Sequence, residues 1–386
     1  MIHDPDSPVP FNKPSFAGNE QQFMFDALSR YHISGDGFYT QLCQQLLQRE
    51  LGVPKALLTT NCTHALEMCA LLLDIGPGDE VILPSFTFVS TANAFVLRGA
   101  KPIFIDIRPD TLNIDERLIE TAVTPRTRAI IVVHYAGVAC EMDAISAIAD
   151  RHGIPIIEDN AHGLFARYKD KPLGSFGVMA TQSFHETKNF TCGEGGALLI
   201  NQAALIEPAE IVREKGTNRN RFFRGQIDKY TWVAPGSSYL PSDLLAAVLW
   251  AQFEARDRIQ RTRREIWERY ASALSGWSRS AGVSLPTVPS HCEQSYHMFY
   301  VLMPDLSERQ SLIDWLRRHN VSAVFHYQPL HRSDAAEQLG ASDVRCPVTD
   351  SVSDRLVRLP LFNDMTHDQQ DRVIEAICSY APTKVA

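Results

Sequence analysis

The sequence predicts an α/β protein in which a large three-layer domain, built on a mainly parallel sheet, precedes a smaller α+β domain. Short, continuous apolar runs recur from about residue 54 to residue 201, and amphipathic stretches separate them. Such runs suit strands buried on both faces, and their alternation with helices suits a parallel sheet. The 386 residues, 45% of them hydrophobic, suffice for two cores. We expect an N-terminal arm at 1–20, the large domain at 21–255 and the small domain at 256–386.

The expected elements follow in chain order. Apolar runs mark the strands of the large domain at Ala56–Leu58, Val81–Leu83, Ile103–Ile105, Ile130–Val133, Ile154–Ile157 and Ala197–Ile200. The expected helices are Cys62–Leu73, Asp143–Arg151, a long helix or helix pair over Ser242–Ala273, and Glu308–Asn320. The small domain adds two strand-like segments, Met298–Leu302 and Val321–Phe325.

Composition argues against several classes of protein. Lys and Arg number 37 and Asp and Glu 45, a net charge of −8, which disfavours non-specific nucleic-acid binding. The acidic stretch Met1–Asp6 lacks the features of a signal peptide, and no apolar run approaches the roughly 18 residues that cross a membrane. The eight cysteines form no Cys-x-x-Cys pair, which argues against a metal site and a disulfide framework. We therefore expect a cytoplasmic protein with reduced thiols, no metal and no membrane or nucleic-acid partner.

Two residues at strand ends indicate chemistry, because ligands of open α/β sheets bind beyond the carboxyl ends of the strands. Asp159 follows the run at Ile154–Ile157, where a carboxylate can hold a protonated pyridinium nitrogen or simply cap a helix. Lys188 lies after Ser183 and before the glycine-rich turn Gly193–Gly196. A desolvated lysine amine forms Schiff bases with carbonyls. Most single lysines are surface groups, so the combination carries the prediction.

Two further segments suit the binding of a phosphorylated ring. Asn61 and Cys62 follow the first expected strand and open a helix, whose N-terminal N–H groups suit a phosphate. Phe88, after the second strand, is placed to stack on a planar ring. Taken singly, the first segment is only a weak signal that an ordinary capped helix also gives, and a lone Phe is more often a core residue.

Together these segments resemble the DegT-type sugar aminotransferases, which depend on pyridoxal 5′-phosphate (PLP) and have the type I, aspartate aminotransferase-like fold. The resemblance covers nearly the whole chain, at Thr60–Thr63, Pro84–Asn93, Val133–Gly137, Glu158–His162 and Ser183–Asn189. It implies that Lys188 bonds to PLP and then acts as general base and acid. Asp159 is implied to pair with the pyridinium nitrogen, His162 to lie near the phenolate oxygen, and Phe88 to stack on the ring.

The resemblance also implies how the cofactor phosphate is held. Ser183 and the backbone around Asn61 and Cys62 are the implied phosphate ligands. Ser238 is implied to reach the cofactor of a neighbouring subunit, since sites in this family lie at a homodimer interface.

Within the family, three stretches are similar to members that aminate C4 of dTDP-linked keto sugars: His185–Asn189, Arg213–Arg219 and Gly236–Leu240. This similarity implies L-glutamate and a dTDP-linked 4-keto-6-deoxy sugar as substrates. Lys215 and Arg219, in a locally basic stretch, are candidates for the nucleotide diphosphate by charge-assisted hydrogen bonds, or for a surface or interface loop. His326 and Tyr327 are candidates for the sugar site.

Some positions depart from the family pattern and leave alternatives open. Many members carry Asn at the Ser238 position and Arg at the Leu240 position, so the group that binds the donor's carboxylate is open. Members similar over the three stretches often have Ala and Gln where Asn160 and His162 stand. The alternatives are a sugar 3-dehydratase, a C3 aminotransferase and a non-catalytic PLP-binding regulator. Lys188 favours transamination over dehydration, and the absence of a basic DNA-binding segment disfavours the regulator.

Overall fold

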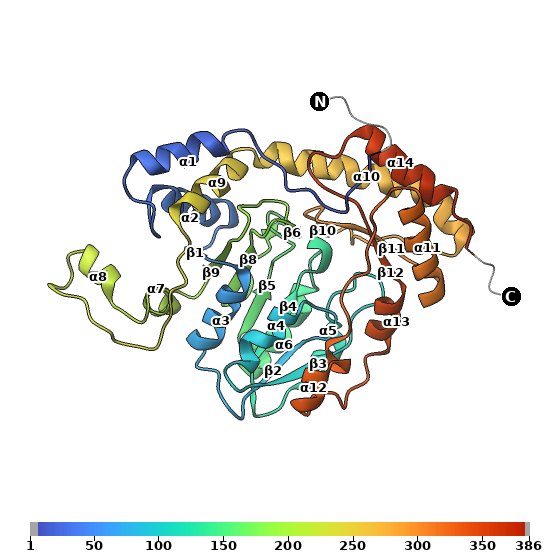
Figure 1. Cartoon of the computed structure of the whole chain (residues 1–386). Helices are drawn as coiled ribbons and strands as arrows, with labels where there is room; N and C mark the ends of the chain where they lie inside the picture. Colours follow the sequence, from blue (N-terminus) through green and yellow to red (C-terminus); the bar gives the residue numbers. More distant parts are fainter. Residues whose placement is uncertain (1–6, 383–386) are drawn as a thin grey trace.

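The computed structural model describes residues 7–382, so residues 1–6 of the expected arm and 383–386 of the expected small domain lie outside the described residues. Its centre is a seven-stranded sheet of order β1-β9-β8-β5-β4-β2-β3 (Figure 1). The strands are β1 (Lys55–Thr59), β2 (Glu80–Pro84), β3 (Lys101–Ile105), β4 (Thr127–Val133), β5 (Ile156–Asp159), β8 (Met179–Ser183) and β9 (Gly196–Ile200). Only β9 pairs antiparallel with its neighbours, β1 and β8, so the sheet is mainly parallel, as predicted.

Side chains alternate across this sheet, and a helical layer covers each face. Leu57, Leu83 and Ile131 point into a core with α3 (Cys62–Leu72), α4 (Val89–Val96) and α7 (Ile206–Arg213). The opposite face meets α2 (Phe38–Leu51) and α9 (Asp243–Glu254) over β1, β8 and β9, and α5 (Glu116–Ala122) and α6 (Met142–His152) over β2 and β4. The helix α1 (Glu20–Ser29) packs on α9. The predicted three-layer α/β fold is confirmed.

A second core lies beyond α9. It is built from α10 (Arg256–Ala281), α11 (Leu306–Arg318), α14 (His367–Cys378) and the antiparallel pair β11 (Phe299–Leu302) and β12 (Leu356–Leu359), with α13 (Pro347–Arg355) beside α11. The shorter elements are β6 (Arg167–Tyr168), β7 (Lys171–Pro172), β10 (Cys292–Glu293), α8 (Arg219–Phe223) and α12 (Asp334–Gln338). The helix pair expected over Ser242–Ala273 is present as α9 and α10.

Two expected strands differ from the structure. The segment Val321–Phe325 is not a strand, because Val321 bridges only Val9 and Val324 bridges only Arg358, two different neighbours that cannot continue one ladder. The strand expected at Ile154–Ile157 begins at Ile156 and runs to Asp159. Pro155, which precedes it, has no N–H to donate to a ladder.

The sheet gathers the predicted site at one edge. Asn61 follows β1, Phe88 follows β2, Asp159 ends β5 and Ser183 ends β8, so all four lie at the carboxyl ends of mutually parallel strands. Over residues 7–382, none of the helices combines the length and apolar character that a membrane span requires.

Candidate active site

A cavity of ≈ 840 Å³ opens at this edge of the sheet, between the two cores. Nine of the residues singled out from the sequence line it: Asn61, Cys62, Phe88, Asp159, His162, Ser183, Lys188, His326 and Tyr327. Residues that lie more than 200 positions apart in the chain therefore share one site, and its volume falls in the range of ligand pockets.

Lys188 lies in the turn between β8 and β9, where its backbone N–H donates to the carbonyl oxygen of His185 at 2.9 Å. Over the described residues, its side-chain amine makes no hydrogen bond or ion pair, and it faces the cavity. Burial lowers the pKa of Lys188 from 10.5 to about 8, against the opposing effect of Cys62 and Asp159. An amine with such a pKa is partly uncharged near neutrality and so is a competent nucleophile.

Asp159 is buried at the end of β5 and is held from two sides. Its Oδ2 accepts a hydrogen bond from Thr91 Oγ1 at 2.7 Å, and its Oδ1 accepts from the backbone N–H of Ala161 at 3.3 Å. Burial raises the pKa of Asp159, although the hydrogen bond from Thr91 opposes this. A cationic N–H placed against this carboxylate would favour its anionic form.

Three histidines form one wall of the cavity. His162 stacks on His297, with ring centroids 4.3 Å apart, and His326 stacks on Tyr327 at 3.6 Å. His326 Nδ1 is 2.7 Å from the hydroxyl of Tyr135. Burial lowers the pKa of His162, His297 and His326 well below the usual value, so all three are neutral at physiological pH.

The start of α3 forms the opposite end of the cavity. Asn61 caps the helix, with its Oδ1 accepting from the backbone N–H of His64 at 2.8 Å. The N–H groups of Cys62 and Thr63 have no acceptor among the described residues, and both residues line the cavity. This turn is pressed against β9, because a Cβ on Gly196 would lie 2.3 Å from the carbonyl carbon of Asn61. Only glycine fits at that position.

The arrangement fits PLP. The free N–H groups of Cys62 and Thr63 suit its phosphate, and Asp159 suits its ring nitrogen. Phe88 is an aromatic residue 55% exposed in a cavity wall, where a planar ring can cover it. His162 Nδ1 is enclosed without a hydrogen-bond partner, as expected of an atom that awaits a ligand oxygen.

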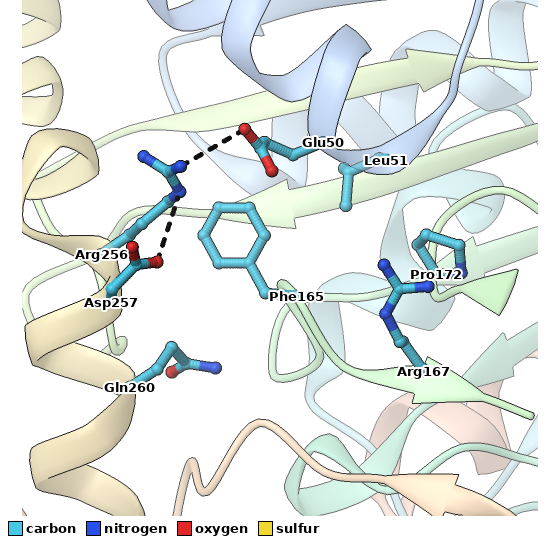
Figure 2. A pocket seen from close by; sticks show the side chains of 8 residues that line it. All are labelled: Glu50, Leu51, Phe165, Arg167, Pro172, Arg256, Asp257 and Gln260. Atoms are coloured by element: carbon cyan, nitrogen blue, oxygen red, sulfur yellow. Dashed lines mark ion pairs between the residues drawn. The ribbon is translucent and has the colours of Figure 1, made fainter. Parts of the chain in front are cut away.

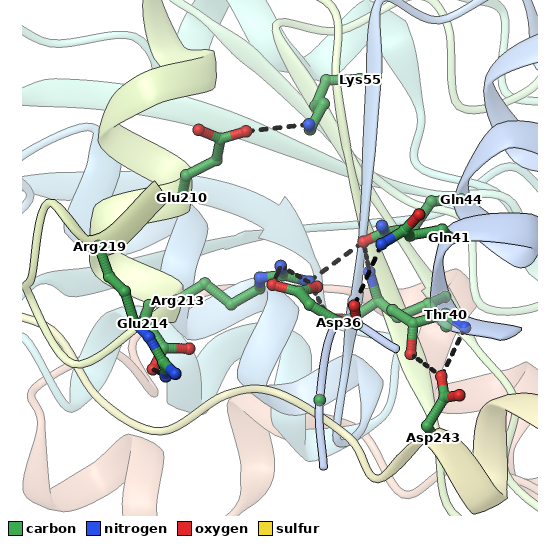
Figure 3. Close-up of polar contacts among 12 residues, drawn as sticks. Asp36, Thr40, Gln41, Gln44, Lys55, Glu210, Arg213, Glu214, Arg219 and Asp243 are labelled. Atoms are coloured by element: carbon green, nitrogen blue, oxygen red, sulfur yellow. Dashed lines mark hydrogen bonds and ion pairs between the residues drawn. The ribbon is translucent and has the colours of Figure 1, made fainter. Parts of the chain in front are cut away.

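Ser238, Lys215 and Arg219 do not line this cavity. They belong to the segment that follows α7, of which the part with α8 extends away from the sheet in Figure 1. Glu214 is the ion-pair partner of both cations, at 2.9 Å from Lys215 Nζ and 3.2 Å from Arg219 Nη1, and it bridges Ser238 through the backbone. Figure 3 shows Arg219 beside Glu214, and Arg213 directed instead at Asp36. A role for this segment in another subunit's site stays a prediction.

Among the residues that sequence reasoning missed, three polar ones bear on the chemistry of the site. Thr91 lies within a recognised segment, but nothing in the sequence shows that its hydroxyl reaches Asp159. His297 and Arg358 come from the second core and line the cavity through tertiary contacts. Arg358 had one available signal, since it is a charged residue inside the apolar run Leu356–Leu359.

A smaller hollow of ≈ 150 Å³ lies between α2, α10 and the turn before β6 (Figure 2). Arg256 forms ion pairs there with Glu50 at 3.5 Å and Asp257 at 3.7 Å. None of the predicted site residues lines it, and its Arg256 charge is already compensated. It therefore offers no catalytic arrangement.

Comparisons with known proteins cover nearly the whole chain. The model of the DegT/DnrJ/EryC1/StrS aminotransferase family matches residues 16–378. The aminotransferase TlmJ from Streptoalloteichus hindustanus is 28% identical with a TM-score of 0.89, and the match covers 97% of this chain and 98% of that one. Spr1654 from Streptococcus pneumoniae in its PLP form is 26% identical (TM-score 0.88, 96% and 98% covered). 3-Amino-5-hydroxybenzoic acid synthase is 29% identical (TM-score 0.86, 96% and 98% covered).

Proposed function

Because this chain belongs to the DegT/DnrJ/EryC1/StrS aminotransferase family and is a PLP-dependent aminotransferase, we propose that its acceptor is a nucleotide-linked keto sugar. The amino group of L-glutamate passes to C4 of dTDP-4-dehydro-6-deoxy-D-glucose. The products are dTDP-4-amino-4,6-dideoxy-D-galactose and 2-oxoglutarate, the reaction of a dTDP-4-amino-4,6-dideoxygalactose transaminase. The similarity of His185–Asn189, Arg213–Arg219 and Gly236–Leu240 to such enzymes supports this choice of acceptor.

The observation that carries the proposal is a single cavity that joins a partly uncharged lysine amine to a buried carboxylate. Lys188, with a pKa of about 8, and Asp159 both line it. PLP, when bound, supplies an electron sink that stabilises negative charge at the carbon next to the transferred nitrogen. The remaining volume leaves room for a second ligand.

The chain's own residues then have separate tasks. Lys188 Nζ holds the cofactor covalently and, once displaced by the donor, takes the proton from the donor's Cα. Positioned general acid–base groups of this kind contribute on the order of 10²–10⁴-fold to rate. Asp159, held by Thr91, keeps the ring nitrogen protonated. Phe88 and His162 orient the ring, and His326 with Tyr327 faces the sugar.

The phosphate end of the site completes the proposal. Ser183 and the N–H groups at the start of α3 hold the cofactor phosphate. Ser238 of the partner subunit donates a hydrogen bond to the same phosphate, so the active form is a homodimer. The protein acts in the cytoplasm. The two half-reactions use one site in turn, which implies ping-pong kinetics.

The test is a reaction of the purified protein with dTDP-4-dehydro-6-deoxy-D-glucose and ¹⁵N-labelled L-glutamate, with Lys188→Ala as the control. NMR of the product locates the label. We expect nitrogen on C4 in the galacto configuration, and no product from the variant. Nitrogen on C3, or loss of water without nitrogen transfer, would identify one of the alternative reactions instead.

A further inference from the structure

Arg358 reaches the active-site cavity from the second core. It lies on β12, opposite Tyr300 of β11, and its side chain lines both the main cavity and a small adjoining hollow beside Thr187. On one side, its guanidinium carbon lies 4.7 Å from the ring centroid of Phe11, in the segment that precedes α1. The guanidinium is therefore packed in place and directed at the site.

In the described part of the chain, this guanidinium lacks a hydrogen-bonding or oppositely charged partner. Over residues 7–382, none of its N–H groups donates a hydrogen bond and no carboxylate forms an ion pair with it. Its Nε is enclosed without any acceptor. Arg358 is partly buried, and because an arginine keeps its charge, a guanidinium enclosed to this degree without a compensating group is unfavourable. An anionic ligand that enters the cavity would supply the missing partner.

The other charges in the cavity wall are already committed. Lys188 is the only other Lys or Arg among the described lining residues, and its amine would hold the cofactor and then move the proton of the donor. Asp159 accepts from Thr91, and Glu194 lies at the exposed rim, 3.7 Å from His185. Three lining histidines are neutral because burial lowers their pKa. Arg358 is the one fixed cation left for a substrate.

We propose that Arg358 binds the α-carboxylate of the amino donor. This inference rests on the proposed function in one respect, namely that the donor is an α-amino acid. That carboxylate is bonded to the carbon whose proton Lys188 removes, so it has to lie inside this cavity. The planar guanidinium fork matches a carboxylate with two parallel hydrogen bonds. Leu240, where many relatives carry Arg, is apolar here and packs against Gly35, so it offers no such group.

The cofactor phosphate is the other anion of the site, and it has its own ligands. Ser183 and the free N–H groups of Cys62 and Thr63 lie on the large-sheet side of the cavity, at the start of α3 and the end of β8. Arg358 comes from β12 and forms no hydrogen bond with these three residues. It is thus assigned to the donor.

The amino-donor half-reaction tests this assignment without any sugar. It is followed by the loss of visible absorbance when the PLP-loaded protein is mixed with amine. L-Glutamate is compared with 4-aminobutanoate, which keeps the amine and the second carboxylate but lacks the α-carboxylate. We expect Arg358→Gln to lower kcat/KM for L-glutamate by about 100-fold and to leave 4-aminobutanoate within about threefold. Arg317→Gln is the matched control, since Arg317 is 74% exposed and pairs with Asp314.

A second measurement does not depend on turnover. Glutarate has two carboxylates and no amine, so calorimetric titration of the PLP-loaded protein reports carboxylate binding alone. We expect the Kd for glutarate to rise by about 100-fold in Arg358→Gln and by less in Arg358→Lys. The lysine variant also provides the test if the glutamine variant fails to fold. Unchanged glutarate binding, or equal losses with glutamate and 4-aminobutanoate, would overturn the assignment. A wild-type protein that reacts with glutamate but not with the dTDP sugar contradicts the proposed acceptor and leaves this inference standing.

Discussion

The lowered pKa of Lys188 makes cofactor uptake by the cofactor-free protein depend on pH in a specific way. Burial lowers this pKa from 10.5 to about 8. At pH 7.5 the uncharged amine is then roughly a quarter of the total, against roughly 0.1% for an ordinary lysine. Only the uncharged amine attacks an aldehyde. We expect the rate constant for covalent uptake of PLP to rise steeply up to about pH 8 and to level off above about pH 9.

The assay is stopped-flow mixing of cofactor-free protein with saturating PLP, followed through the visible absorbance from about pH 6 to about pH 10. Butylamine, a solvated primary amine, is the control for the ionisation of PLP itself. The absolute rate at pH 7.5 is expected to be on the order of 100-fold above that of a protein amine with an unshifted pKa. A rate that keeps climbing to pH 10, in parallel with butylamine, would show that Lys188 is solvated and would refute the reasoning.

Further predictions concern the groups around Lys188. In Lys188→Met, the cofactor-free protein is expected to gain up to about 3 kcal/mol in free energy of unfolding at pH 7. The pKa of Lys188 is lower in the folded than in the unfolded protein, so the stability of the wild type rises with pH between about pH 8 and 10.5. The stability gained by Lys188→Met therefore vanishes above that window. An equal gain at pH 11 would contradict the prediction. Asp159→Asn is expected to weaken PLP binding and slow the glutamate half-reaction by at least 100-fold, and Thr91→Val, which keeps the carboxylate, by about tenfold. Wild-type rates in both would show that Asp159 is only structural. Gly196→Ala is expected to lower the free energy of unfolding by about 1–3 kcal/mol and to weaken PLP binding, because the added Cβ meets the backbone that follows β1. Gly276→Ala on α10 is the control, since a Cβ there has open space. Equal melting temperatures for the two variants would rule out the close approach.

The large sheet and the positions of Asp159 and Lys188 at its edge could be predicted because both depend on local patterns. Apolar runs mark the buried strands, and the polar residue at a strand end, such as Asp159 after β5, falls at the edge where ligands bind. Lys188 was predictable for the same reason, since the sequence places it between two strands and before a glycine-rich turn.

The rest depends on tertiary contacts that no local pattern encodes. Arg358 and His297 reach the cavity from the second core, and Thr91 on α4 donates a hydrogen bond to Asp159 at the end of β5. The basic stretch that contains Lys215 and Arg219 was a candidate for the nucleotide diphosphate or for a surface or interface loop, and Glu214 pairs with both cations. An apolar run also cannot show whether one neighbour or two will pair with it, which is why Val321–Phe325 was wrongly expected to be a strand.

Reduction of the PLP-loaded protein with borohydride, followed by peptide mass spectrometry, tests the central claim most directly. The account predicts a single peptide that carries the reduced cofactor on Lys188, and none in Lys188→Ala. A protein that is colourless when mixed with PLP, or a label fixed to any other lysine, would contradict it.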